Sequence, residues 1–164
     1  MKNIKISVIG LGKLGFPMAL FLRSKFDINA YDSNEDLRNL IKKNPSLHLP
    51  KENNIQKYLK KKLNVFETMH ETLAGTNICY ITVPTPSMNN GKFSNKYLID
   101  VLEKISQFLI KSDNKIKPFI ININSTVSPG SFDELLIPFM KKKGLFINKD
   151  FEFIYNPYFV ALGD

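Results

Sequence analysis

The sequence predicts an α/β fold in which a doubly wound parallel sheet of about six strands carries helices on both faces. Short apolar, β-rich runs alternate along the chain with longer segments whose apolar residues recur at helical spacing. A strand, a glycine turn and a helix follow one another at the N-terminus. With 164 residues, 43% of them hydrophobic, the chain has enough material for one packed core. We therefore expect one domain over residues 1–164.

The first half of the chain opens with a compact run of β-branched residues that ends at a glycine, which is typical of a strand followed by a tight turn. Farther on, prolines interrupt a polar stretch at residues 44–54. The elements expected here are, in order, a strand at residues 4–9, a helix at 13–25, a strand at 28–31, a helix with its N-cap at Ser33 or Asn34, a helix at 55–62 and a short strand at 63–66.

The second half repeats this alternation. Pro84 and Pro86 must lie beyond the fourth strand, because proline donates no hydrogen bond to a neighbouring strand. The elements expected here are, in order, a strand at residues 78–83, a turn at 89–91, a helix at 96–111, a strand at 119–123, a helix at 132–143 and a strand at 152–155.

Composition argues against several functional classes. The single cysteine, Cys79, excludes an intrachain disulfide framework, and two scattered histidines add no metal-binding cluster, so no metal site is expected. Cys79 lies inside an apolar strand, where desolvation disfavours a thiolate, so we interpret it as a core residue. No apolar run approaches the ~20 residues that span a bilayer, and no signal peptide is evident. A cytoplasmic protein without membrane insertion is expected.

The formal net charge of +8 raises the question of a nucleic-acid partner. The densest lysine groups, at residues 57–62 and 141–143, fall at the ends of helix-like segments, where cations are solvated and favour the helix dipole. Arg23 and Arg38 are the only two arginines, although arginine is the residue expected where phosphates or bases are bound bidentately. No nucleic-acid partner is therefore expected, whereas a basic surface still attracts anionic ligands such as nucleotides.

A GxGxxG motif follows the first expected strand and opens the first helix, and its residues are Gly10, Leu11, Gly12, Lys13, Leu14 and Gly15. The first glycine permits a tight turn, the second lets the backbone approach a pyrophosphate, and the third allows close packing of helix on strand. The N-terminus of the helix presents N–H groups and a positive dipole to the phosphates. A glycine turn without a ligand is the alternative interpretation.

Asp32 stands at the end of the second strand, about 20 residues beyond the motif, where a carboxylate binds the ribose hydroxyls of adenosine. A carboxylate repels a 2′-phosphate, and we expect no arginine after Asp32 to offset this repulsion. The motif and Asp32 together predict a Rossmann-type domain that binds NAD in preference to NADP.

Polar loops follow the fourth and fifth strands, at the carboxyl edge where open α/β sheets bind ligands. Val83, Pro84 and Thr85 follow the fourth strand, and Ser125 and Thr126 follow the fifth. We expect their hydroxyl groups to converge near the nicotinamide end of a bound dinucleotide. The alternatives are a loop stiffened by proline without ligand contacts, and a Ser125 side chain that caps a helix.

Four motifs in order resemble the N-terminal domain of the UDP-glucose/GDP-mannose dehydrogenase family. They are the glycine-rich start at residues 8–12, VPTP at 83–86, STVxPG at 125–130 and NPEFLxxG at 156–163, and the resemblance runs from residue 4 to the last residue. The resemblance implies a nucleotide-sugar 6-dehydrogenase, which oxidises a sugar C6 alcohol to a carboxylate in two NAD-dependent steps through a cysteine of a later domain. UDP-glucose, UDP-N-acetylmannosamine and GDP-mannose are the candidate substrates.

The resemblance also assigns roles to single positions. Thr126 matches a threonine that helps to position a catalytic water, and Thr85 matches one near the cofactor. Tyr158 stands where the family usually has a glutamate, and a phenol cannot serve as a base near neutral pH, so either the base role has moved or the activity is altered. The segment whose backbone faces the nucleotide sugar is matched by Phe159, Val160 and Ala161.

The family has further parts that the resemblance does not cover. We expect the chain to be truncated before the family's central helix, which mediates homodimer formation, and before the C-terminal domain that binds the UDP-sugar. The chain alone is then expected to bind NAD without completing the oxidation, and the nucleotide sugar is the partner of the full-length protein. The alternative is a stand-alone, non-catalytic regulatory module that binds NAD.

Overall fold

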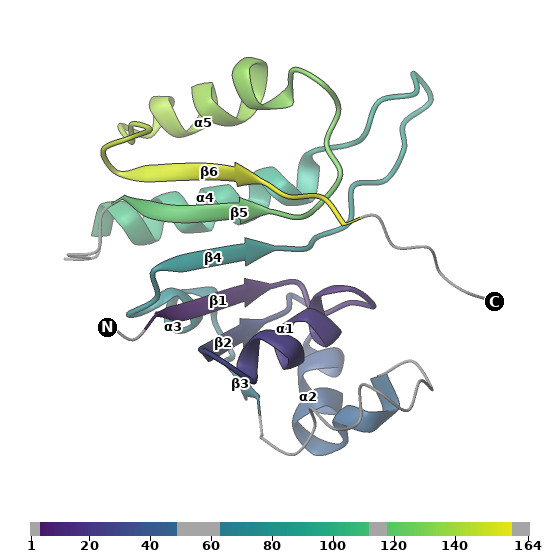
Figure 1. Ribbon diagram of the computed structural model, residues 1–164. Helices are drawn as coiled ribbons and strands as arrows, with labels where there is room; N and C mark the ends of the chain where they lie inside the picture. Colours follow the sequence, from purple (N-terminus) through teal and green to yellow (C-terminus); the bar gives the residue numbers. More distant parts are fainter. Residues whose placement is uncertain (1–3, 49–62, 112–117, 159–164) are drawn as a thin grey trace.

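The computed structural model describes residues 4–48, 63–111 and 118–158, and a sheet of six parallel strands forms its centre (Figure 1). The strands are β1 (Lys5–Ile9), β2 (Asp27–Tyr31), β3 (Asn64–Val65), β4 (Ile78–Ile81), β5 (Phe119–Ile123) and β6 (Phe151–Tyr155). Their order across the sheet is β3-β2-β1-β4-β5-β6, and each neighbouring pair is parallel. The predicted doubly wound, Rossmann-type sheet is confirmed, and its order reverses between β1 and β4.

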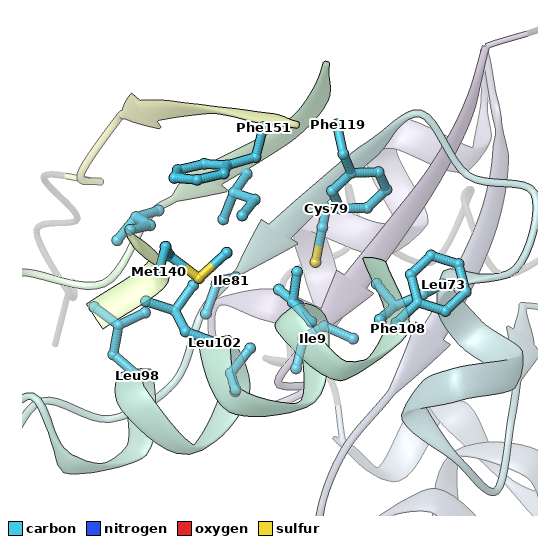
Figure 2. Packing of buried hydrophobic residues seen from close by; sticks show 14 of the residues in the cluster. Ile9, Leu73, Cys79, Ile81, Leu98, Leu102, Phe108, Phe119, Met140 and Phe151 are labelled. Carbon is cyan, nitrogen blue, oxygen red and sulfur yellow. The ribbon is translucent and has the colours of Figure 1, made fainter. Parts of the chain in front are cut away.

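Helices cover both faces of the sheet, as predicted, and each face has its own hydrophobic core. The helices are α1 (Gly15–Arg23), α2 (Glu35–Lys43), α3 (Met69–Leu73), α4 (Lys96–Lys111) and α5 (Ile137–Lys142). Val8 of β1 packs with α1 and α2 in one cluster, whereas Ile9 packs with α3, α4 and α5 in the other (Figure 2 shows part of the latter). Because adjacent residues of a strand point to opposite faces, β1 is buried on both sides.

Local sequence signals account for the helix boundaries. The Asn34 side chain accepts a hydrogen bond from the N–H of Leu37 and caps α2, which confirms the second of the two expected N-caps. Thr68 and Glu71 bond each other's backbone N–H groups in a capping box that starts α3. The bounds of α4 are those predicted, because its buried residues follow an unbroken helical period.

Several expected elements differ in the structure. The strand expected at residues 78–83 ends at Ile81, because the chain turns away before Pro84. The helix expected at 132–143 begins as a π-helical turn, Phe132–Leu136, before α5. A short 3₁₀ helix, Pro45–His48, and α3 occur where no helix was predicted. The helix expected at 55–62 lies outside the described residues.

Two further findings concern membrane insertion and the surroundings of Cys79. In the part of the chain that the structure describes, no helix is both long and apolar enough to cross a membrane. Cys79 is fully buried next to Phe119 in the larger core (Figure 2), and burial raises the pKa of its thiol to about 12. The prediction that Cys79 is a core residue is confirmed.

Candidate functional site

A cleft of about 580 Å³ opens at the carboxyl end of the sheet, beside the β1–β4 reversal. Its walls come from the glycine-rich turn, the end of β2, the loop after β4 and one side of α4. Volumes of this size accommodate small-molecule ligands and cofactors. Seven of the predicted cofactor-binding residues line it, namely Gly10, Gly12, Lys13, Leu14, Asp32, Val83 and Pro84.

The three glycines of the turn meet different surroundings. Gly10 has a φ of +91°, and a Cβ there would lie 2.6 Å from the carbonyl oxygen of Thr82. A Cβ at Gly15 would overlap the carbonyl oxygen of Gly10, so Gly15 serves the packing of α1 against the turn and does not line the cleft. At Gly12, by contrast, a Cβ would meet no atom of the described residues within 4 Å. This open space lies where a pyrophosphate would approach the backbone.

The N-terminus of α1 is left available for an anion. Leu14 provides no side-chain cap, and the first turn of α1 carries no acidic residue, whereas Asn34 and Thr68 cap α2 and α3. The positive end of the α1 dipole is therefore not neutralised by its own first turn. Lys13 lines the cleft at the same turn and adds a positive charge.

Asp32 joins the glycine-rich turn to the start of α2. Its Oδ2 atom accepts a hydrogen bond of 2.6 Å from the N–H of Leu11, and its Oδ1 atom accepts one of 2.9 Å from the N–H of Asn34. Leu11 itself is buried and does not line the cleft. A carboxylate has about four acceptor sites, so Asp32 keeps acceptor capacity for the hydroxyl groups of a ribose.

The loops after β4 and β5 are fastened to each other. The buried Ser125 donates a hydrogen bond of 2.7 Å from Oγ to the carbonyl oxygen of Val83, and Ser128 Oγ accepts one of 2.9 Å from the N–H of Phe93. Among the described residues predicted to bind the cofactor, Thr85, Ser125 and Thr126 lie outside the lining of the cleft. Thr126 is exposed and Thr85 is half-buried. The two loops do converge, through contacts with each other.

Tyr158 lies against α1. Its hydroxyl donates a hydrogen bond of 2.9 Å to the sulfur of Met18. Burial, and secondarily the neighbouring Tyr80, raise the pKa of the Tyr158 phenol above its usual value. The phenol is therefore protonated near neutral pH and cannot replace a carboxylate as a base. The three residues expected to face the substrate, Phe159, Val160 and Ala161, lie outside the described residues.

Sequence reasoning missed residues that shape the cleft. Thr82 donates from Oγ1 to the carbonyl oxygen of Gly10 at 2.7 Å and lines the cleft itself. Tyr97, Asp100 and Lys104 line the cleft from α4. Their spacing of three and four residues places them on one face of α4, beside its apolar stripe. This spacing is the feature of the sequence that could have identified them as neighbours.

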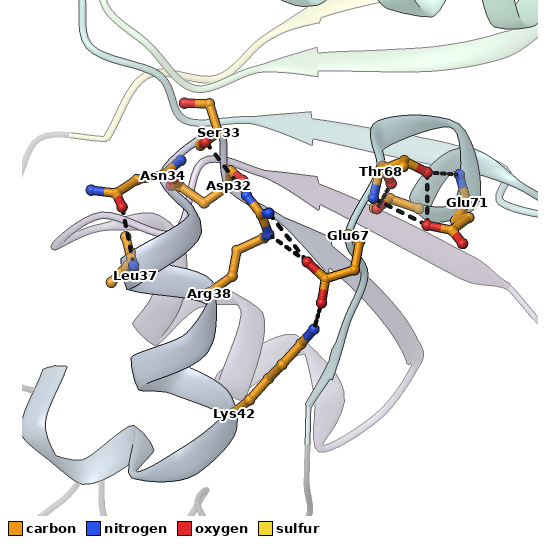
Figure 3. A network of polar contacts seen from close by, with 10 residues as sticks. Asp32, Ser33, Asn34, Leu37, Arg38, Lys42, Glu67, Thr68 and Glu71 are labelled. Carbon is orange, nitrogen blue, oxygen red and sulfur yellow. Dashed lines mark hydrogen bonds and ion pairs between the residues drawn. The ribbon is translucent and has the colours of Figure 1, made fainter.

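Arg38 lies close to Asp32 and bears on the expected preference for NAD over NADP. The expectation that no arginine follows Asp32 is wrong, because Arg38 lies six positions farther on and donates from Nη1 to the carbonyl oxygen of Asp32 at 2.8 Å (Figure 3). Arg38 is only 7% exposed and forms an ion pair with Glu67. The preference for NAD therefore depends on where this arginine is held, because an arginine near the ribose can accommodate a 2′-phosphate.

Comparisons with known proteins agree with this geometry. Over residues 4–164 the sequence matches the NAD binding domain of the UDP-glucose/GDP-mannose dehydrogenase family. The UDP-N-acetyl-D-glucosamine 6-dehydrogenase of Pseudomonas aeruginosa is 29% identical over 100% of this chain and 37% of its own length. The GDP-mannose 6-dehydrogenase of Pseudomonas savastanoi pv. phaseolicola is 30% identical over 96% of this chain and 36% of its own length. This chain thus spans little more than a third of these relatives.

Solved structures support the same fold. A ternary complex of GDP-mannose dehydrogenase from Pseudomonas aeruginosa superposes with a TM-score of 0.80 at 24% identity, over 95% of this chain and 36% of that protein. A UDP-D-ManNAc dehydrogenase from Pyrococcus horikoshii superposes with a TM-score of 0.75 at 25% identity, over 96% of this chain and 37% of that protein. From the glycine-rich turn, the strand order and the match over residues 4–164, we conclude that the chain belongs to the UDP-glucose/GDP-mannose dehydrogenase family, as its NAD-binding domain.

Proposed function

We propose that this chain supplies the NAD site of a nucleotide-sugar 6-dehydrogenase, which oxidises the C6 alcohol of a UDP- or GDP-linked sugar to a carboxylate. The observation that carries the proposal is the cleft at the β1–β4 reversal, in which Gly12 leaves open space beside the uncapped end of α1. The dehydrogenase names of the relatives support the reaction class. They keep the expected candidates UDP-glucose, UDP-N-acetylmannosamine and GDP-mannose open and add UDP-N-acetylglucosamine.

The residues of the cleft fit NAD part by part. The turn at Gly12 and the N-terminus of α1 suit the pyrophosphate, Lys13 adds a cation beside it, and Asp32 offers acceptors to the adenosine ribose. Val83 and Pro84 continue the wall at the end of β4, where we place the nicotinamide end. When bound, NAD supplies the hydride acceptor for the alcohol.

The chemistry at the sugar is proposed to use two threonines of this structure together with groups that lie outside the described residues. Thr126, exposed beyond the end of β5, is proposed to position a water, and Thr85 to lie near the cofactor. Phe159, Val160 and Ala161 are proposed to present their backbone to the sugar. Since Cys79 is buried with a raised pKa, we assign the nucleophile to a cysteine of a later domain. We also propose that the full-length protein forms a homodimer through the family's central helix. Its proposed location is the cytoplasm.

The test separates cofactor binding from turnover. The 164-residue chain should bind NAD with micromolar to millimolar affinity by calorimetry, without oxidising any sugar nucleotide. The full-length protein should release two NADH per sugar oxidised, because conversion of an alcohol to a carboxylate removes four electrons. A folded chain that fails to bind NAD would contradict the proposal. Binding by the full-length protein without turnover of any candidate sugar would favour the regulatory module.

A further inference from the structure

We propose that Glu67 is a positioning residue that sets the preference of this site for NAD over NADP, because it holds Arg38 against the backbone of Asp32. The inference rests on the proposed NAD site and adds a residue that determines its selectivity. Glu67 lies just beyond β3, 35 positions after Asp32 in the sequence, and it does not line the cleft that Asp32 lines.

Arg38 is engaged on both edges of its guanidinium group (Figure 3). On one edge, Nε and Nη2 donate to Oε2 of Glu67 at 3.2 and 3.1 Å. On the other, Nη1 donates to the carbonyl oxygen of Asp32 at 2.8 Å and to that of Ser33 at 3.4 Å. These bonds use four of the five N–H donors of an arginine, so the side chain has little left to offer another acceptor.

A third contact places the guanidinium beside the cleft. Its carbon atom lies 5.4 Å from the centre of the Tyr31 ring, within the range of a cation–π interaction. Tyr31 and Ser33 both line the cleft, next to Asp32. Arg38 therefore sits directly behind the part of the wall that would face the adenosine ribose.

The position of Glu67 is itself well defined. The preceding residue, Phe66, donates its N–H to the carbonyl oxygen of Ala30 at 2.9 Å, so the chain is still attached to the sheet there. Glu67 also forms an ion pair with Lys42 of α2. Its hydrogen bonds to Lys42 and Arg38 lower the pKa of its carboxyl group, so Glu67 is ionised near neutral pH. A charged carboxylate anchored to the sheet thus fixes the arginine.

The consequence concerns the 2′-position of the ribose. Held by Glu67, Arg38 donates to the carbonyl oxygens of Asp32 and Ser33, so it steadies the backbone that follows the Asp32 side chain and leaves the Asp32 carboxylate to face the ribose. Without Glu67, the guanidinium would lose two of its four hydrogen bonds and be free to turn toward the cleft, where an arginine binds a 2′-phosphate. Glu67 thereby keeps an arginine that suits NADP out of the site.

The experiment compares the dissociation constants of NAD and NADP for the 164-residue chain and its variants by calorimetry. For Glu67→Ala we expect the ratio of the NADP to the NAD dissociation constant to fall by about tenfold or more, with weaker NAD and tighter NADP binding. Glu67→Gln, which keeps the size of the side chain, should move the ratio in the same direction. Glu103→Ala is the matched control, because it removes a carboxylate that pairs with Lys143 at 2.7 Å and lies outside the cleft lining.

The double variant Glu67→Ala/Arg38→Ala tests whether the arginine carries the effect. Any gain in NADP affinity should disappear with the guanidinium. A ratio that stays within about twofold of the original value in folded Glu67→Ala and Glu67→Gln would overturn the inference. So would a gain in NADP affinity that persists without Arg38. If the original chain binds neither dinucleotide, the proposed NAD site fails and this inference fails with it, whereas NAD binding with an unchanged ratio refutes the selectivity role alone.

Discussion

Thr82, at the end of β4, donates a hydrogen bond of 2.7 Å from its hydroxyl to the carbonyl oxygen of Gly10, which lies 72 positions earlier in the chain. The same hydroxyl is 3.2 Å from the carbonyl oxygen of Ile9. The Thr82 side chain thus fastens the glycine-rich turn, and with it the start of α1, to the strand next to β1, in addition to the hydrogen bond between Leu11 and Asp32. The shape of the anion site therefore depends on a residue outside the glycine motif.

Replacing Thr82 with valine tests this fastening. Valine has nearly the same shape but no hydroxyl, so two partly buried carbonyl oxygens lose a donor, at a cost of about 1–2 kcal/mol in the free energy of unfolding. Thr82→Ser keeps the donor and should cost much less. Urea denaturation followed by circular dichroism measures both, and equal losses for the two variants would show that the hydroxyl does not matter.

Gly12 and Gly15 should respond in opposite ways to a side chain. Gly12→Val should leave the thermal midpoint nearly unchanged, because the added atoms enter open space, but it should abolish NAD binding by filling the pyrophosphate position. Gly15→Ala should lower stability by about 1–3 kcal/mol, because its Cβ overlaps the carbonyl oxygen of Gly10. Calorimetric titration and thermal melts distinguish the two effects. Undiminished NAD binding by a folded Gly12→Val variant would contradict the site.

Cys79 should make the stability depend on pH at the alkaline end. Burial raises the pKa of its thiol from about 9 to about 12, so the folded chain keeps a proton that the unfolded chain releases. The thiol's contribution is complete below about pH 9 and is lost as pH rises toward 12, with a slope of about 1.4 kcal/mol per pH unit.

Comparison with Cys79→Ala isolates this contribution from the titration of lysines and tyrosines. The difference in unfolding free energy between the original chain and the variant should shrink from pH 9 to pH 11. A constant difference would mean that the thiol is not shielded from solvent. In the folded chain, iodoacetamide should leave Cys79 unmodified at pH 8 and react with it only after denaturation.

Tyr158 should prove dispensable for proton transfer. Its phenol is protonated near neutral pH and bonded to the sulfur of Met18. If the full-length protein is the proposed 6-dehydrogenase, Tyr158→Phe should keep its turnover within about twofold and leave the pH profile unchanged. Steady-state kinetics across pH measures this. If the variant lost the change in turnover that the original protein shows at alkaline pH, the phenol would be a titrating group of the reaction.

Tyr158→Glu tests the opposite change. It should raise turnover if the missing carboxylate limits the reaction, and unchanged turnover would refute that idea.

Much of the fold follows from periodicity and turn chemistry. The bounds of α4 were predicted because its apolar residues keep a helical period over 16 residues, and those of β5 because it is a short buried-type run that ends before Asn124. The five-residue α3 was missed because it is too short to show a helical period, although Thr68 and Glu71 carry the spacing of a capping box. The π-helical start before α5 has no sequence signal that we recognise.

The site was predictable where its residues are neighbours in the sequence. The glycine turn and Asp32 form one local unit, and the structure brings Gly10, Gly12 and Asp32 into one cleft. Thr82 escaped notice because its role depends on a partner across the sheet. The bond from Ser125 to the carbonyl oxygen of Val83 was not predicted, because a strand end alone does not determine which way a hydroxyl points. Contacts between residues that are far apart in the sequence can be identified only once the fold is known.

The strand order has a consequence for the newly made chain. One edge of β1 can pair with β2 as soon as residue 31 has been synthesised, but its other edge pairs Ile6 with Ile78, 72 positions later. Until then, an apolar strand in the middle of the future sheet offers unpaired N–H and C=O groups to any other strand nearby. Slow, non-local pairing of this kind delays folding. The synthesis of β4 therefore closes the second edge of β1 and moves the unpaired edge outward to β4, which waits for β5.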